Sequence, residues 1–274
     1  MGRRLVNGVA SGAIAADDRG LQYGDGLFET MAAMDGRIRH FALHMARLET
    51  GCGRLGITMP LVALLEEECL QVLEGLGSGV VKLVITRGPG PRGYRPPEDP
   101  TVTRIVMASA TRTAPSATPE GIVARVCDTR LGLNPRLAGI KHLNRLEQVL
   151  ACAEWDDPEI AEGLMLATDE RLIGATATNL FLVRHGRLHT PEIRDCGVAG
   201  IMRQLVLAAA KALDLGIEVG DLGLAELRAA DEIFVTNAVT GIRPVIEVRG
   251  EGSWPAGEVT RALRAQTEPG SAPT

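Results

Sequence analysis

The sequence predicts an α+β protein with two domains of mixed helices and strands. Before residue 111, two amphipathic helix patterns stand among β-branched strand patterns. Residues 111–121, "TRTAPSATPEG", are rich in Thr, Ala, Pro and Ser and lack periodicity, which is typical of a linker. Strand and helix patterns resume after this stretch. We therefore predict a smaller N-terminal α+β domain at 1–112, a linker at 113–121, a larger C-terminal domain at 122–268 and a flexible tail at 269–274.

The N-terminal elements follow from local patterns. "LFETMAAM" (27–34) and "RIRHF" (37–41) flank the turn residues Asp35 and Gly36 and predict a hairpin. Apolar residues at helical spacing predict one helix that starts at 41 and a second from 61 to 76. β-branched runs predict further strands at 80–87 and 104–110.

The C-terminal patterns also mix strands and helices. "GLMLAT" and "RLIGA" predict a hairpin, and a long helix is expected from Ile201 to Leu213. Further strands are expected at 122–127, 178–184, 231–237 and 243–248. The final ten residues, "AQTEPGSAPT", have little apolar surface to bury, so we expect them to fray.

The composition excludes several classes of function. A net charge of −5 and an aromatic content of 3% provide neither a basic footprint nor stacking platforms for nucleic acid. No apolar stretch is long enough for a membrane span or a signal peptide. Five cysteines without C-x-x-C or zinc-like spacing indicate reduced thiols, a cytoplasmic protein and no metal site.

One lysine lies in an unusual place. In "LAGIKHLNRLEQ" (137–148), apolar residues from Leu143 onward follow helical spacing, which puts Lys141 at or just before a first helical turn. Unpaired amides and the positive end of the helix dipole there would lower the pKa of its ammonium group, as a Schiff-base lysine requires. A solvated surface lysine is the alternative interpretation.

Two segments could bind anions. Gly197 and Gly200 precede the helix predicted from Ile201, and exposed amides at such a helix start suit a phosphate. "TNAVTG" (236–241) could add further donors. A turn before a core helix and a plain loop are the respective alternatives. His44 and Arg47 share a helix face, where Arg47 could bind a phosphate or merely pair with a nearby acid.

"RGPGPRGY" has the G-x-G-x-x-G spacing of a dinucleotide fingerprint, but that fingerprint requires a helix to begin there. Pro89 and Pro91 prevent a helix, so we reject the dinucleotide interpretation. Arg87, Arg92 and Arg95 would instead suit a carboxylate-bearing ligand through forked hydrogen bonds. A solvated basic loop is the alternative.

Seven stretches together make the chain resemble the fold-type IV pyridoxal-phosphate enzymes, which are D-amino acid aminotransferase-like, and among these the aminodeoxychorismate lyase family. They are "DRGLQYGDGLFET" (18–30), "HMARLETGCGRL" (44–55), "ITRGPGPRGY" (85–94), "LAGIKHLNRLEQVL" (137–150), "TNLF" (178–181), "GVAGIMRQ" (197–204) and "DEIFVTNA" (231–238). The resemblance covers nearly the whole chain. It implies two α/β domains, pyridoxal 5'-phosphate as cofactor between them, and a homodimer.

The resemblance also implies site residues and a reaction. Lys141 would form the covalent imine with the cofactor and then move protons. The cofactor phosphate would be bound by Arg47, by the backbone of Ile201 and Met202, and by the turn at Asn237 and Ala238. Thr30, Arg92 and Tyr94 would contact the substrate, and Thr30 would also be catalytic together with Lys141. The implied reaction converts 4-amino-4-deoxychorismate to p-aminobenzoate and pyruvate, in folate biosynthesis.

One position departs from the family pattern. Relatives usually carry a glutamate five residues before the asparagine of "TNLF", where its carboxylate pairs with the pyridine nitrogen, and this chain has Gly174 there. Asp169 and Glu170 are poorly placed to replace it. The electron sink would be weaker without that carboxylate, which harms a transaminase more than a lyase whose product is aromatic. The alternatives are a branched-chain or D-amino acid aminotransferase and a cofactor-free binding relative.

Overall fold

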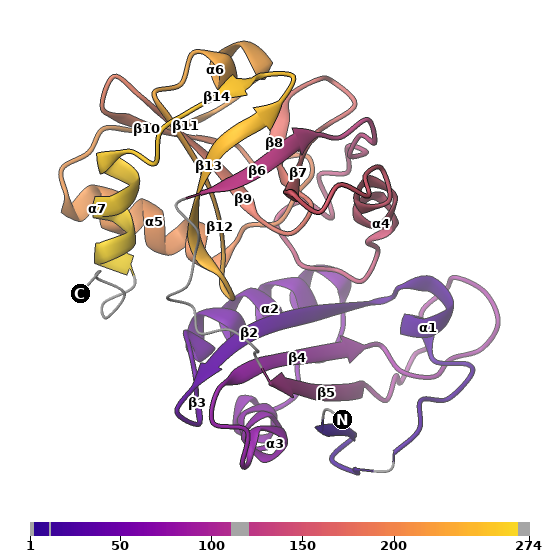
Figure 1. Cartoon of the computed structure of the whole chain (residues 1–274). Coiled ribbons are helices and arrows are strands. Elements are labelled where there is room, and N and C mark those ends of the chain that lie inside the picture. Colours follow the sequence, from indigo (N-terminus) through magenta and orange to yellow (C-terminus); the bar gives the residue numbers. More distant parts are fainter. Residues whose placement is uncertain (1–2, 11, 111–120, 268–274) are drawn as a thin grey trace. The chain divides into compact units, whose positions relative to one another are not determined.

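The computed structural model describes residues 3–10, 12–110 and 121–267 (Figure 1). The predicted tail lies outside these ranges, and so does the predicted linker except for Gly121. The chain divides into two compact units: unit 1 is Met1–Arg112 with Ile140–Asn144, and unit 2 is Thr113–Gly139 with Arg145–Thr274. The segment that contains Lys141 therefore packs with unit 1, whereas the sequence analysis assigned it to the C-terminal domain.

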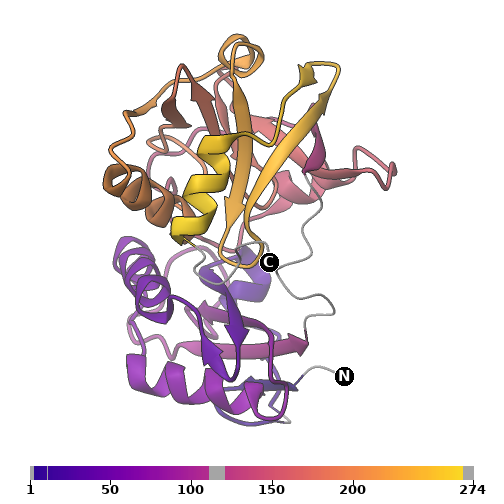
Figure 2. The same cartoon turned by 60° about the vertical axis from the view of Figure 1, so that its left-hand side comes forward.

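Unit 1 is built on a five-stranded antiparallel sheet in the order β1-β5-β4-β2-β3. Helix α2 packs against β2, and α3 packs against β1, β4 and β5 (Figure 2). Alternating apolar residues such as Met31, Val81 and Leu83 are fully buried and form its core. The elements are β1 (Arg3–Val6), α1 (Arg19–Tyr23), β2 (Gly26–Met34), β3 (Arg37–Ile38), α2 (Phe41–Leu55), α3 (Val62–Leu73), β4 (Gly79–Thr86) and β5 (Thr103–Ala110).

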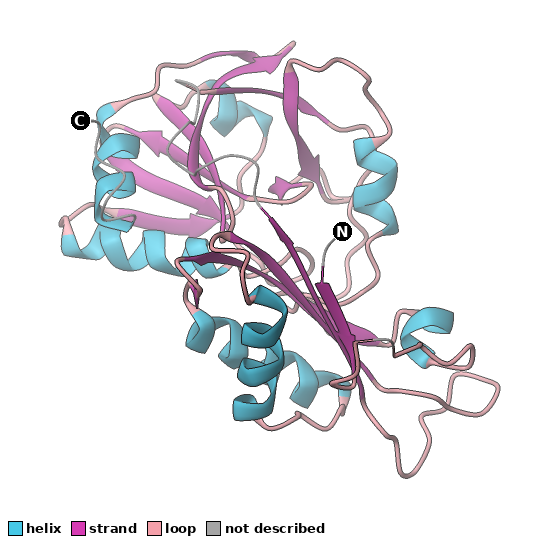
Figure 3. Cartoon of the chain, turned by 60° about the horizontal axis from the view of Figure 1, so that its bottom comes forward, coloured by secondary structure: helices cyan, strands magenta, loops and turns pink. Residues whose placement is uncertain are grey.

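Unit 2 contains a nine-stranded mixed sheet in the order β11-β10-β9-β12-β13-β6-β7-β8, with β14 beside β13. The sheet curls, because β8 at one end of the order also contacts β9 and β10. Helices α5 and α7 pack together against β12 (Figure 3). Phe181 and Phe234 stack at 4.9 Å between ring centroids beneath these helices.

The unit 2 elements, in chain order, are β6 (Ile122–Val126), α4 (Leu146–Cys152), β7 (Ile160–Leu166), β8 (Leu172–Ala175), β9 (Asn179–Arg184), β10 (Arg187–Pro191), α5 (Ile201–Ala212), β11 (Ile217–Gly220), α6 (Leu224–Arg228), β12 (Glu232–Asn237), β13 (Gly241–Arg249), β14 (Gly252–Ser253) and α7 (Glu258–Thr267).

Most predicted elements are present, but two expectations differ from the structure. Of the final ten residues, which were expected to fray, 265–267 continue α7 through Thr267, whose side chain is buried, and the other seven lie outside the described residues. The helix after Lys141 begins only at Leu146. Its residues Leu146, Val149 and Leu150 are exposed, so the apolar pattern does not mark a face buried in this chain. No described helix is long and apolar enough to cross a membrane.

Candidate functional site

Lys141 is held by strand pairing. The Phe28 amide donates to the Lys141 carbonyl at 2.9 Å, and the Leu143 amide donates to the Gly26 carbonyl at 3.0 Å. The Lys141 Nζ lies 4.4 Å from the centroid of the Phe28 ring, within the range of a cation–π interaction. The backbone on both sides of the lysine is thus fixed to β2, and its amine is placed over the ring of Phe28.

This geometry corrects the predicted role of the helix. The N-cap of α4 is Arg145, four residues after Lys141. The field of a helix dipole fades within the first turn, so it does not act on Lys141 as predicted. The lysine is instead preceded by Gly139, whose φ of 83° favours glycine and whose backbone pairs with the segment before α5.

Thr30 lies on the same face of β2 as Phe28, because side chains alternate along a strand. Its partner across the sheet is Lys82 on β4, and the Lys82 Nζ lies 5.1 Å from the Phe28 centroid. Two ammonium groups therefore approach one aromatic ring. The sequence analysis did not select Lys82, although a lysine inside the apolar strand "VVKLVITR" was a usable signal.

Glu29 points to the opposite face of β2 and lies in a buried polar cluster with α2. The cluster consists of Glu29, His44 and Arg47, and Glu29 is 1% exposed. His44 Nδ1 contacts Glu29 Oε2 at 2.6 Å, Arg47 Nε donates to Oε1 at 2.8 Å, and Arg47 Nη2 donates to Oε2. Arg47 was predicted as a phosphate ligand. One edge of its guanidinium, Nε and Nη2, binds the Glu29 carboxylate, which orients the group and which the sequence analysis missed.

The start of α5 in unit 2 has the features of an anion site. Its N-cap is Gly200, which has no side chain to cap the amides of Ile201 and Met202. A Cβ at Gly200 would lie 2.0 Å from Asn179 Oδ1, so any other residue there would force Asn179 to move. Asn179 Nδ2 in turn donates to the Val198 carbonyl at 2.9 Å and fixes the approach to the helix.

Arg203 adds positive charge to this first turn. Burial lowers the pKa of its guanidinium below its usual range. Arg203 Nη2 donates to the Pro191 carbonyl at 3.1 Å, and its buried Nε has no hydrogen-bond partner among the described residues. The sequence analysis did not select this residue.

Asn237 shapes the turn after β12. Its Oδ1 accepts hydrogen bonds from the Val239 amide at 2.9 Å and from the Thr240 amide at 2.8 Å. Ala238 therefore lies inside an asparagine-stabilised turn. The side chain of Asn237 supports the backbone, and the turn is the feature that could meet a ligand.

No carboxylate extends from β8 at Gly174. A Cβ there would meet the Thr178 carbonyl oxygen at 3.0 Å. The exposed Asp169 and Glu170 pair with Arg171 and Arg130 and do not replace the missing group. Glu162 is the buried acid nearby on β7, but its carboxylate accepts hydrogen bonds from the hydroxyl groups of Thr176 and Thr178.

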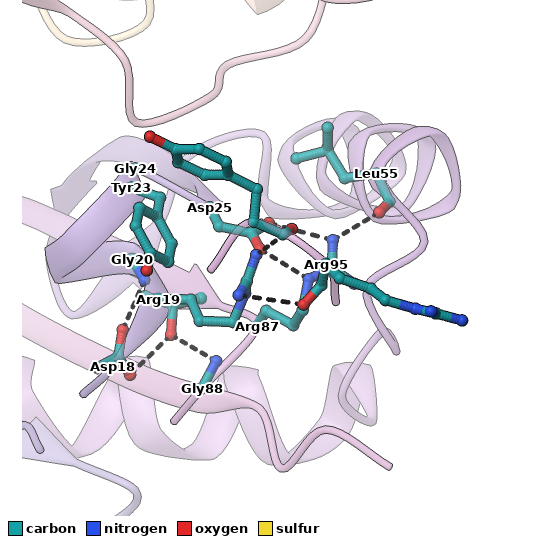
Figure 4. Close-up of polar contacts among 12 residues, drawn as sticks. Asp18, Arg19, Gly20, Tyr23, Gly24, Asp25, Leu55, Arg87, Gly88 and Arg95 are labelled. Atoms are coloured by element: carbon teal, nitrogen blue, oxygen red, sulfur yellow. Dashed lines mark hydrogen bonds and ion pairs between the residues drawn. The ribbon is translucent and has the colours of Figure 1, made fainter. Parts of the chain in front are cut away.

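As predicted, no helix forms in the glycine-rich loop after β4. Arg92 is exposed, and Tyr94 is 84% exposed. Arg87 differs from the prediction, since it donates to Asp25 and to the carbonyl groups of Leu55 and Gly56 (Figure 4). It is a buried structural residue and not a ligand-binding one.

The charge of Asp25 is maintained by its two arginine partners. Burial raises the pKa of the Asp25 carboxyl, but hydrogen bonds from Arg87 and Arg19 outweigh burial and keep this pKa below its ordinary value. The carboxylate is therefore ionised at neutral pH and binds both guanidinium groups.

The model of the family "Amino-transferase class IV" matches residues 26–248, and the chain belongs to this family. Its members are pyridoxal-phosphate-dependent enzymes, so the cofactor class and the fold class expected from the sequence are confirmed. The chain is 36% identical to an aminodeoxychorismate lyase of Vibrio harveyi over 94% of this chain and 97% of the relative. A putative branched-chain-amino-acid aminotransferase of Methanocaldococcus jannaschii is 33% identical over 92% of this chain and 88% of the relative.

A solved structure gives the same result. The 4-amino-4-deoxychorismate lyase of Pseudomonas aeruginosa is 45% identical, with a TM-score of 0.90 over 97% of this chain and 98% of that one. The described residues suit the family cofactor at two points: a lysine whose backbone pairs with β2 and a glycine-capped helix start. They do not provide a carboxylate at position 174 for the pyridine nitrogen.

Proposed function

We propose that this protein is an aminodeoxychorismate lyase that uses pyridoxal 5'-phosphate to convert 4-amino-4-deoxychorismate to p-aminobenzoate and pyruvate. The observation that carries the proposal is Lys141, which lies within "LAGIKHLNRLEQVL" and is fixed by backbone pairing to β2. The similarity to lyases from two organisms supports the choice of reaction within the family.

Lys141 would hold the cofactor through its aldehyde and, once released, would accept the ring proton from the amine-bearing carbon of the substrate. The cofactor would supply an electron sink at that carbon. The amides of Ile201 and Met202 would bind its phosphate, because they are donors at the positive end of α5. Arg47 and the turn at Asn237 and Ala238 are the other proposed phosphate ligands.

Thr30 positions the substrate beside the amine of Lys141, since its side chain leaves β2 on the face of Phe28. The substrate carries two carboxylates, and the exposed loop residues Arg92 and Tyr94 would bind them. Elimination of pyruvate leaves an aromatic ring, so the reaction has a driving force that transamination lacks. This difference fits Gly174, which provides no carboxylate to strengthen the electron sink.

A spectrum with product analysis tests the proposal. The protein loaded with pyridoxal phosphate should show a visible-range band that borohydride removes, and peptide mapping should locate the reduced adduct on Lys141. The chain has only two other lysines, Lys82 and Lys211, and an adduct on either would contradict the site assignment. Rapid amino transfer to 2-oxoglutarate, with no p-aminobenzoate formed from 4-amino-4-deoxychorismate, would contradict the lyase assignment.

We also propose that the protein is a cytoplasmic homodimer. Leu146, Val149 and Leu150 form an apolar face of α4 that is exposed in the single chain. Exposed apolar patches of this kind mark association surfaces. Light scattering should give the mass of two chains, and Val149→Glu should reduce it toward one. A monomeric wild type at micromolar concentration would contradict this proposal.

A further inference from the structure

Arg19 binds the backbone of the glycine-rich loop. It is 3% exposed, at the start of α1. Its guanidinium donates to three successive carbonyl groups of the loop: Nη1 to Gly93 at 2.9 Å, Nη2 to Tyr94 at 2.9 Å and Nη1 to Arg95 at 3.4 Å (Figure 4). Because a guanidinium is planar and carries several donors, this one side chain binds three adjacent carbonyl groups at once.

Hydrogen bonds to Asp25 and Asp18 hold Arg19 and the start of α1 in place. Arg19 Nε donates to Asp25 Oδ2 at 2.9 Å, and Arg87 Nε donates to the same oxygen at 2.7 Å. Asp18 caps α1 by accepting from the Gly20 amide at 2.8 Å, and it accepts from the Thr86 hydroxyl at 2.9 Å. The guanidinium of Arg19 therefore has little freedom to move away from the loop.

An aromatic contact supports the same segment. The Arg19 guanidinium lies 5.0 Å from the centroid of the Tyr23 ring, and this ring meets Tyr94 edge-on at 5.3 Å. The Gly93 amide donates to the Tyr23 hydroxyl at 3.3 Å. The backbone and one side chain of the loop are thus tied to α1, while Arg92 remains exposed.

We propose that Arg19 is a positioning residue for substrate binding, because it fixes the loop that presents Arg92 and Tyr94. This inference rests on the proposed substrate role of these two residues. Lysine cannot replace Arg19, since an ammonium group is a compact point charge without the planar fork that reaches several carbonyls.

Limited proteolysis of the cofactor-loaded protein tests the structural part. Trypsin can cut after Arg92, whereas Pro96 protects the bond after Arg95. Arg19→Lys should increase the rate of cleavage after Arg92 by about tenfold, because charge-assisted hydrogen bonds are lost. The exposed Arg37→Lys on β3 is the matched control and should leave this rate unchanged. Equal rates in the two variants would overturn the inference.

Kinetics tests the functional part. Arg19→Lys should raise the KM for 4-amino-4-deoxychorismate by about tenfold, with a smaller change in kcat and an unchanged visible cofactor band. Faster cleavage with unaltered KM would overturn the positioning role. If the wild type forms no p-aminobenzoate, the proposed function fails, and the proteolysis result still reports on Arg19 separately.

A milder variant covers the case in which Arg19→Lys folds poorly. Tyr23→Phe removes only the hydroxyl group that accepts from the Gly93 amide. It should increase cleavage after Arg92 by about threefold, in line with the loss of one neutral hydrogen bond. Absence of any increase in Tyr23→Phe, together with a poorly folded Arg19→Lys, would also count against the inference.

Discussion

Glu29→Gln should destabilise unit 1 strongly. The substitution keeps the shape of the side chain but removes the negative charge from the cluster with His44 and Arg47. Both carboxylate oxygens of Glu29 accept hydrogen bonds. Arg47 donates to each oxygen, and His44 contacts Oε2 as well. Glutamine has a single acceptor oxygen, so at least one donor would face an NH₂ group.

The magnitude follows from burial. Removal of one partner from a buried ion pair costs about 3–5 kcal/mol. The side chain of Arg47 is 12% exposed, so water can replace part of the interaction and the lower end of this range applies. A loss of about 3 kcal/mol lowers the Tm by at least about 6 °C in a domain of ordinary size.

Calorimetry at pH 7 is the appropriate assay, because both tryptophans, Trp155 and Trp254, lie in unit 2 and would not report on unit 1. Glu49→Gln on the exposed side of α2 is the matched control, with the same change of charge. It should alter stability by no more than about 0.5 kcal/mol. A Tm difference of about 2 °C corresponds to about 0.5–1 kcal/mol. If the Tm values of Glu29→Gln and Glu49→Gln differ by less than this, the reasoning is refuted.

The same cluster predicts a dependence on pH. Burial raises the pKa of the Glu29 carboxyl, but the hydrogen bonds from His44 and Arg47 and the charge of Arg47 outweigh burial, so this pKa lies below its ordinary 4.5. A carboxyl whose pKa is lower in the folded state stabilises the fold above its unfolded-state pKa. The Tm difference between wild type and Glu29→Gln should be full at pH 7 and shrink as the pH falls below about 4.5.

Three further substitutions test the proposed site. Gly200→Ala places a Cβ 2.0 Å from Asn179 Oδ1, so Asn179 must move and its hydrogen bond to the Val198 carbonyl before α5 is disturbed. The Kd for pyridoxal phosphate, measured by fluorescence titration, should rise about tenfold. Thr30→Val should lower kcat for p-aminobenzoate formation by about a hundredfold without altering the visible cofactor band. Gly174→Glu should increase amino transfer from amino acids, measured as loss of the aldehyde-form absorbance; an unchanged rate would contradict the role given to the missing carboxylate.

Local patterns were sufficient for elements stabilised by local contacts. The hairpin at Asp35 and Gly36 was predictable because both turn residues adopt positive φ, as such turns require. Helix α7 was not predictable in the same way. Its N-terminus is capped by Glu232 on β12, whose carboxylate accepts from the amides of Val259 at 3.1 Å and Thr260 at 2.9 Å. A cap supplied from a distant strand leaves no signal in the helix sequence.

The candidate site shows the same division. Lys141, Arg47 and the glycines before α5 were selected because their residue types and spacing indicate chemistry. Glu29 and Arg19 were missed, because their importance depends on partners that folding brings to them, a helix side chain in one case and loop carbonyls in the other. Sequence patterns thus indicated candidate ligand-binding groups more readily than the residues that orient such groups.

The physical reason for which Lys141 was selected is contradicted by the structure. The predicted helix dipole required a helix to begin at the lysine, but the chain first pairs with β2 and forms α4 only from Leu146. Strand pairing restricts the backbone at Phe28 and Lys141 together, and the Lys141 Nζ lies 4.4 Å from the centroid of the ring. A lysine at a fraying helix start would lack this restriction. Precise placement of a nucleophile requires a rigid support, and strand pairing with β2 would supply it in the role proposed for Lys141.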